Sequence, residues 1–235
     1  MKKNKLSILY ISPLWAGIKP FFFEGKERIS GMPAFFNVFK SILDDDKIEK
    51  IHMILFVYND KSKIIMPEIY KNKIFVYPFF ISGSLSLYFN TIKAIIKGVS
   101  LVYNQKIKCI YGHGTISAIA SIIGKITGVK HFRRIYGTFL YRKIKEGKNI
   151  LRSNFYEFLA FNLKCNGLII TNDGTHGDKV FHKIGNKETE LHFLLNGLNK
   201  LPKIPSKVDS IKNMSKPFFS YVARVDRWKR QFLLI

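Results

Sequence analysis

The chain alternates between short, almost continuously apolar runs and longer segments with helical periodicity, and this alternation constrains its fold most. Strands buried on both faces of a parallel sheet have such unbroken apolar runs. We predict strands at Leu6–Ser12, Ile51–Tyr58, Ile74–Phe80, Lys108–Tyr111, Val129–Tyr136, Gly167–Thr171 and Glu190–Leu195. We predict helices at Pro33–Leu43, Ser86–Tyr103, Thr115–Thr127, Asn154–Lys164 and Asp178–Ile184. The alternation predicts a Rossmann-like, doubly wound parallel α/β sheet with right-handed crossovers.

The periodic pattern stops near residue 200 and resumes at residue 217. The segment between carries two prolines, many lysines and little periodicity, which is typical of an interdomain linker. We therefore predict a first domain over residues 1–200, a linker over 201–216, and the first strand and helix start of an incomplete second domain over 217–235.

The charge balance is strongly basic, with 39 Lys plus Arg against 16 Asp plus Glu and a formal net charge of +23. Such a surface attracts polyanions, which include nucleic acid, anionic lipid headgroups and phosphorylated substrates. Part of the excess reflects a composition rich in Lys, Ile, Asn and Phe, so charge alone selects no partner. The two cysteines, Cys109 and Cys165, are too few for a disulfide framework and favour a reducing cytoplasmic compartment.

The amino terminus has the outline of a short signal peptide, because lysines precede an apolar run from Leu6 to Ile18. Pro13 interrupts the run and no small-x-small cleavage site follows, so we favour a buried first strand. No uncharged apolar stretch reaches about 18 residues, so we expect no transmembrane helix.

A glycine-containing turn, Gly112–Gly114, follows one predicted strand and precedes a helix. Backbone N–H groups and a helix amino terminus can bind an anion at such a turn. The third glycine of the dinucleotide fingerprint is replaced by Ser117, and the acidic residue about 20 positions on is missing, which disfavours nicotinamide and flavin cofactors. A tight strand-to-helix turn without any ligand is the alternative.

His113 lies within this turn, at the strand end where open α/β sheets bind ligands, and is a candidate catalytic residue. The alternative is a surface histidine without a role. No histidine or cysteine has metal-ligand spacing. The acidic run Asp44–Asp46 precedes a strand, so we interpret it as a solvated turn at the opposite edge and predict no metal site. Nucleophile-elbow and phosphate-loop motifs are absent from the sequence, which disfavours hydrolases and nucleoside triphosphatases.

Two cations, Arg224 and Lys229, flank a predicted strand-to-helix turn near the end of the chain. Their spacing allows both to converge on one diphosphate, with a bidentate guanidinium and a point charge. Surface charge without a ligand is the alternative.

Four segments, in order, resemble glycosyltransferase family 4, whose members are retaining enzymes with the GT-B fold. They are ILYISPLWAGIKP…GMPAFFNVFKSI, YGHGTISAIASIIGKITGVKHFRRIYGT, LIITNDGTHGDKVFHKIG…TELHFLLNGL and ARVDRWK. The resemblance spans essentially the whole chain, and it identifies the first domain as the acceptor side and the second as the donor side. Two departures stand out: Tyr136-Gly137 replaces a frequent His-Gly, and the E-x7-E motif would lie beyond Ile235.

The resemblance implies hexosyl transfer from a nucleotide-diphosphate sugar with retention and without a metal or other cofactor. The candidate site residues are His113 and Tyr136 as catalytic; Arg224, Lys229, Gly17 and Gly31 at the donor diphosphate; and Gly112, Gly114, Gly137, Thr138 and Asn172 at the acceptor-side cleft. A purely structural role is the alternative for Asn172.

The implied acceptor is a cell-surface polysaccharide or a lipid-linked glycan, and the implied location is cytoplasmic, on the inner face of the plasma membrane. We expect Phe21–Phe23 and nearby lysines to touch an anionic membrane, and the chain alone to be incomplete as an enzyme. The rival hypotheses are a basic α/β module that binds nucleic acid or anionic membrane, and a nonfunctional fragment. Specific nucleic-acid binding is not expected, because the cations are dispersed and no recognised motif is present.

Overall fold

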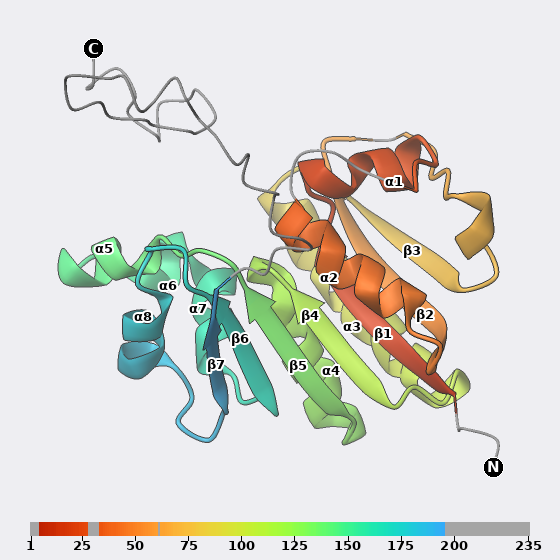
Figure 1. Cartoon of the computed structure of the whole chain (residues 1–235). Helices are drawn as coiled ribbons and strands as arrows, with labels where there is room; N and C mark the ends of the chain where they lie inside the picture. The colour runs from red at the N-terminus through yellow and green to blue at the C-terminus, as the bar shows by residue number, and fades with distance from the viewer. Residues whose placement is uncertain (1–4, 28–32, 61, 196–235) are drawn as a thin grey trace, which may run out of the picture. The chain divides into compact units, whose positions relative to one another are not determined.

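A seven-stranded parallel sheet forms the centre of the computed structural model, which describes residues 5–27, 33–60 and 62–195. The strands are β1 (Leu6–Pro13), β2 (Ile48–Tyr58), β3 (Ile74–Ile81), β4 (Cys109–His113), β5 (Lys130–Ile135), β6 (Gly167–Thr171) and β7 (Leu191–Leu194). Their order is β3-β2-β1-β4-β5-β6-β7, and every neighbouring pair is parallel (Figure 1). The predicted Rossmann-like α/β fold class is confirmed.

Helices cover both faces of this sheet. They are α1 (Lys19–Phe23), α2 (Pro33–Asp44), α3 (Ser84–Asn104), α4 (Ala118–Thr127), α5 (Leu140–Lys145), α6 (Ile150–Ser153), α7 (Phe155–Asn162) and α8 (Gly177–Ile184), with 3-10 turns η1 (Ala16–Ile18), η2 (Glu68–Tyr70) and η3 (Thr115–Ser117). Figure 1 shows α2 in front of β1 and β2, with α3 and α4 behind the sheet. The chain therefore changes faces between β3 and β4, as a doubly wound sheet requires.

All seven predicted strands occur, with ends that move by at most three residues. The largest change is at β2, which begins at Ile48 because Leu6 already pairs with it there. The helix predicted at Thr115–Thr127 opens as the 3-10 turn η3, and the one predicted at Asn154–Lys164 ends at Asn162 because Leu163 is extended. Helices α1, α5 and α6 were not predicted, since segments of four to six residues are too short to show helical periodicity.

Phe21 and Phe22 are part of α1 and belong to the same buried core as Phe39 of α2. Neither side chain is exposed to solvent. Their rings pack edge to face against each other, with centroids 5.0 Å apart, and both contact Phe39. The prediction that Phe21–Phe23 touches a membrane is therefore wrong for Phe21 and Phe22, whereas Phe23 is only partly buried. The three aromatic residues stabilise the α1–α2 side of the sheet by burying apolar area.

Arg133 is the largest fully buried side chain of the described residues, and it caps helix α7. Its guanidinium donates hydrogen bonds to the backbone oxygens of Leu159 (3.1 Å), Ala160 (2.7 Å) and Leu163. The last carbonyls of a helix lack partners within the helix and carry partial negative charge. Arg133 donates to these carbonyls, of which that of Leu159 also accepts the backbone N–H of Leu163 (3.1 Å), and thereby attaches α7 to β5.

The chain divides between Gly197 and Leu198 into two units. The predicted linker at 201–216 and the predicted start of a second domain at 217–235 lie outside the described residues. Within the described part, α3 has the length and apolarity of a membrane-spanning helix. Its buried residues Ala94, Gly98, Leu101 and Val102, however, pack into the layer against the sheet.

Candidate functional site

The candidate site lies at the carboxyl edge of the sheet, where the strand order reverses. From β1 the chain continues to β2 on one side, whereas β4 pairs with β1 on the other side. Open α/β sheets bind ligands outside the carboxyl ends of the strands at such a switch point. The turns after β1, β4, β5 and β6 all lie at this edge.

His113, at the end of β4, is packed among aromatic side chains and is only 2% exposed. Its ring stacks on Trp15, with centroids 5.5 Å apart, and lies 4.9 Å from the ring of Tyr136. Its Nδ1 lies 3.4 Å from the hydroxyl of Tyr10. Burial, with a smaller effect of the Arg134 cation, lowers the pKa of His113 to about 3. The imidazole is therefore neutral at physiological pH, and it fits a positioning role better than direct acid catalysis.

Tyr136 follows β5 and lies half-buried between His113 and Arg134. The guanidinium carbon of Arg134 is 4.6 Å from the centre of the Tyr136 ring, within cation–π range. Burial raises the pKa of Tyr136 to about 12, although the Arg134 charge opposes this shift. The phenol is therefore protonated at neutral pH, so it can donate a hydrogen bond but cannot act as a general base.

The turn after β5 is locked to the turn after β6 by hydrogen bonds. The N–H of Thr138 donates to the Thr175 hydroxyl (3.0 Å), and the Thr138 hydroxyl donates to the buried Glu157 carboxylate (2.6 Å). A Cβ on Gly137 would lie 2.5 Å from a carboxylate oxygen of Asp173, so the two turns approach each other closely. These contacts hold the turn after β5 against the turn after β6 and against α7.

Glycine is required at both positions of the β4 turn, Gly112 and Gly114, but for different structural reasons. A Cβ on Gly112 would lie 2.7 Å from the backbone oxygen of Ser117 and 2.8 Å from the Cβ of Ala120, so only glycine allows β4 and α4 to pack this closely. Gly114 has φ 72° and ψ −157°, a conformation available essentially to glycine alone. Its N–H donates to the backbone oxygen of Arg134 (2.9 Å). Local packing thus accounts for both glycines without an anion.

The structure brings together most of the predicted site residues that it describes. His113, Tyr136, Gly112, Gly114, Gly137 and Thr138 lie on the neighbouring ends of β4 and β5. Asn172 follows β6, exposed, and donates its N–H to Leu194 (2.8 Å). Gly17 is buried in η1, in the connection after β1. Gly31, Arg224 and Lys229 lie outside the described residues.

Sequence reasoning missed three residues that shape this edge: Trp15, Arg134 and Glu157. Trp15 covers His113 from the connection after β1, and its indole N–H donates to the Ser12 hydroxyl (3.3 Å). Glu157 accepts hydrogen bonds from three residues although it is a buried carboxylate. An acidic residue in the first turn of an apolar helix was the available signal for Glu157, because charged residues are rarely buried without partners.

Among residues 5–27, 33–60 and 62–195, no three His, Cys, Asp or Glu side chains cluster as metal ligands. Asp44 ends α2 at the amino-terminal edge of the sheet, opposite the candidate site. It pairs with Lys40 (2.8 Å) and accepts a hydrogen bond from Tyr70 (2.8 Å). The acidic run therefore lies at a surface turn, as predicted.

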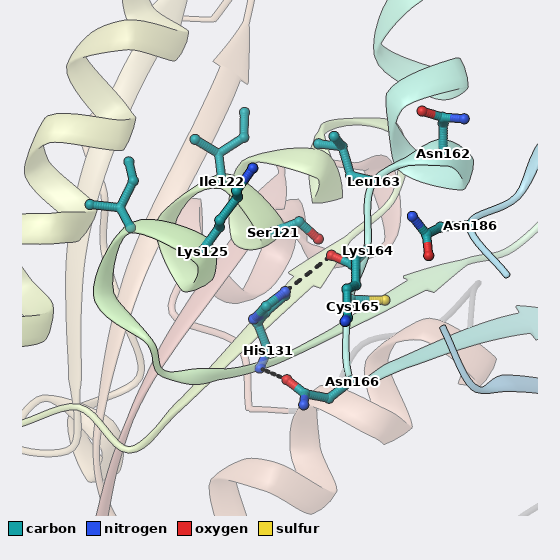
Figure 2. A pocket seen from close by; sticks show the side chains of 11 residues that line it. Ser121, Ile122, Lys125, His131, Asn162, Leu163, Lys164, Cys165, Asn166 and Asn186 are labelled. Carbon is teal, nitrogen blue, oxygen red and sulfur yellow. Dashed lines mark hydrogen bonds between the residues drawn. The ribbon is translucent and has the colours of Figure 1, made fainter. Parts of the chain in front are cut away.

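A cavity of about 610 Å³ lies between α4, the start of β5 and the segment that joins α7 to β6 (Figure 2). Its polar groups are largely engaged within the fold. The two ring nitrogens of His131 lie 3.0 and 3.2 Å from the backbone oxygens of Val129 and Lys164. The backbone N–H of His131 donates to the side-chain oxygen of Asn166 (2.9 Å). The cavity is thus part of the packing between α4 and α7, and it lies at the edge of the sheet away from the switch point.

No protein-family model matches the chain, and no curated protein matches it. Among solved structures it is similar to the apo form of the lipopolysaccharide outer core galactosyltransferase WaaB, with 14% identity over 79% of this chain and 44% of that one and a TM-score of 0.47. It is also similar to Phytolacca americana UGT2 complexed with UDP-2-fluoroglucose and pterostilbene, with 9% identity over 86% of this chain and 56% of that one and a TM-score of 0.47. The chain spans about half the length of these structures. The seven-stranded parallel sheet itself establishes the fold class.

Proposed function

We propose that the chain supplies the acceptor-side domain of a glycosyltransferase, which transfers a sugar from a nucleotide-diphosphate sugar to a glycan or lipid-linked acceptor. The observation that supports this proposal best is the convergence of the turns after β1, β4 and β5 at the switch point between β1 and β4. The resemblance to glycosyltransferase family 4 along the chain gives the reaction class. The proposal includes retention at the anomeric carbon and catalysis without a metal.

The phenol of Tyr136 remains a hydrogen-bond donor at neutral pH. Its oxygen is shielded from solvent in this structure, so a sugar or acceptor oxygen reaches it only when neighbouring side chains move. His113 acts on that phenol indirectly: its neutral ring is held between Trp15 and Tyr136 and keeps both aromatic side chains in place. In this proposal His113 is a positioning residue, and Tyr136 is the residue that touches a substrate.

The leaving nucleoside diphosphate needs positive charge as the bond to the sugar breaks. The family resemblance assigns this role to Arg224 and Lys229, with Gly17 and Gly31 nearby. We propose that the reaction occurs at the cytoplasmic face of the plasma membrane, on a cell-surface polysaccharide or its lipid-linked precursor.

The experiment uses the product of the whole reading frame beside the 235-residue chain. Both are incubated with several nucleotide sugars and a lipid-and-glycan extract, and nucleoside diphosphate release is measured. We expect release by the whole product and none by the chain alone, because misplacing reacting groups by about 1 Å already costs about 10²-fold in rate. Failure of the whole product to release diphosphate from any donor would contradict the proposed function, and equal turnover by both would contradict the division into two domains.

A further inference from the structure

Helix α3 forms an outer layer over the sheet and buries only one side. Ala94, Gly98, Leu101 and Val102 face the sheet and α4. A Cβ on Gly98 would lie 2.3 Å from the side chain of Ile123, so the two helices approach closely there. The helix is therefore fixed to the domain along this side, and its opposite side is presented outward.

The opposite side of α3 carries a row of large apolar side chains, interrupted between Ile96 and Tyr103 by the exposed Ser100. The row, called here the α3 stripe, consists of Leu85, Phe89, Ile92, Ile96 and Tyr103, each between 41% and 71% exposed. Their spacings of four, three, four and seven residues place them on one line along a helix about 30 Å long. Single exposed apolar residues are common on protein surfaces, but a group of them along one side of a helix marks an interaction surface.

Lysines flank the stripe on one side, and α3 itself carries no acidic residue. Lys93 and Lys97 lie on α3 itself, along one flank of the stripe, and the Lys97 ammonium is 4.5 Å above the ring of Tyr77. A second copy of the chain docked on this stripe would bring like charges together, so the surface favours an anionic partner.

We propose that the α3 stripe is a membrane-docking surface that lies in the headgroup region of an anionic lipid bilayer. An apolar, aromatic-containing row flanked by lysines is the pattern by which helices lie in this interface. Lysine side chains can extend from the apolar boundary to the headgroups. The helix lies on the membrane and does not cross it, because its other side is packed against the sheet. The proposal does not depend on the sugar-transfer reaction.

The test measures binding of the 235-residue chain to sedimented vesicles of phosphatidylcholine, with and without phosphatidylglycerol. We expect tighter binding to the phosphatidylglycerol vesicles, and weaker binding as salt rises. The double variant Phe89→Ser/Ile96→Ser should bind at least about ten-fold more weakly, because two side chains no longer enter the apolar boundary. Lys93→Gln should weaken binding roughly five-fold, the equivalent of about 1 kcal/mol per basic residue.

The matched control is Ile69→Ser/Leu194→Ser, which makes the same kind of exchange at two exposed sites outside α3, 62% and 54% exposed. It should bind like the parent chain. Equal losses in both double variants, or equal binding to both vesicle types, would overturn the proposal. Dimers of the parent chain that dissociate in the stripe variant would also overturn it, because a second copy would then cover α3.

Discussion

His113 should make the chain less stable as the pH falls from about 7 to 5. In the unfolded chain the imidazole has its ordinary pKa of 6.5, whereas in the folded chain burial lowers the pKa to about 3. Between these values the unfolded state binds a proton that the folded state does not, so the free energy of unfolding falls with pH. At pH 5 the loss attributable to His113 is about 2 kcal/mol, a figure that changes little for any folded pKa below about 4.

Urea unfolding at pH 7.5, 6.0 and 5.0, followed by far-UV circular dichroism, measures this effect. His113→Asn should reduce the pH dependence by about 2 kcal/mol over this range. Some dependence remains, because burial also lowers the pKa of His52. The carboxyl groups of Asp60 and Glu146, with pKa values of about 2, lose their contribution only at lower pH.

The control is His182→Asn, at an exposed position on α8, which should leave the pH dependence as in the parent chain. Only the change with pH is compared, so a general loss of stability in His113→Asn does not affect the result. If that variant does not fold, His113→Gln serves the same purpose. Parallel pH curves for the parent chain and the His113 variant would refute the buried, neutral imidazole and its role in positioning Tyr136.

Two further predictions concern packing, and urea unfolding at neutral pH measures both. Arg133→Met should lower the free energy of unfolding by about 2–5 kcal/mol, because the carbonyls of Ala160 and Leu163 lose the donors that Arg133 supplies, at about 1–3 kcal/mol each. The exposed Arg142→Met should change it by less than about 0.5 kcal/mol. Equal effects would contradict the capping role. Gly112→Ala should cost at least about 1–3 kcal/mol through its clash with η3 and α4. Gly83→Ala meets nothing within 4 Å and should cost less, with only the weaker N-cap preference of alanine at the start of α3 opposing it.

The strands could be predicted from the sequence because their burial on both faces leaves unbroken apolar runs. Helix α1 could not, because Lys19–Phe23 is helical only in the context of the core that holds Phe21 and Phe22. The same aromatic run was mistaken for a membrane surface, since composition does not distinguish a buried phenylalanine from an exposed one. A row of exposed apolar side chains lies on α3, where the sequence predicts a helix but not which side is covered.

The position of the candidate site could be predicted from the order of strands and helices in the sequence. The burial of His113 and the placement of the charged residues around it could not. His113 is buried because Trp15, about a hundred residues earlier, stacks over it, and no local pattern contains that contact. Arg133 and Arg134 are adjacent in β5, so alternation places them on opposite faces. Only the three-dimensional structure shows that one caps α7 and the other lies against Tyr136.

The most direct test of the account compares Tyr136→Phe with Lys125→Ala in the nucleoside diphosphate release assay, using the product of the whole reading frame. Tyr136 lies at the switch-point edge, whereas Lys125 lines the cavity at the other edge of the sheet. Loss of one hydrogen bond to a reacting substrate, worth about 1–3 kcal/mol, predicts a turnover lower by about 5-fold to 150-fold in Tyr136→Phe. The account predicts parental turnover in Lys125→Ala; parental turnover in Tyr136→Phe would contradict the assignment of the site to the carboxyl edge.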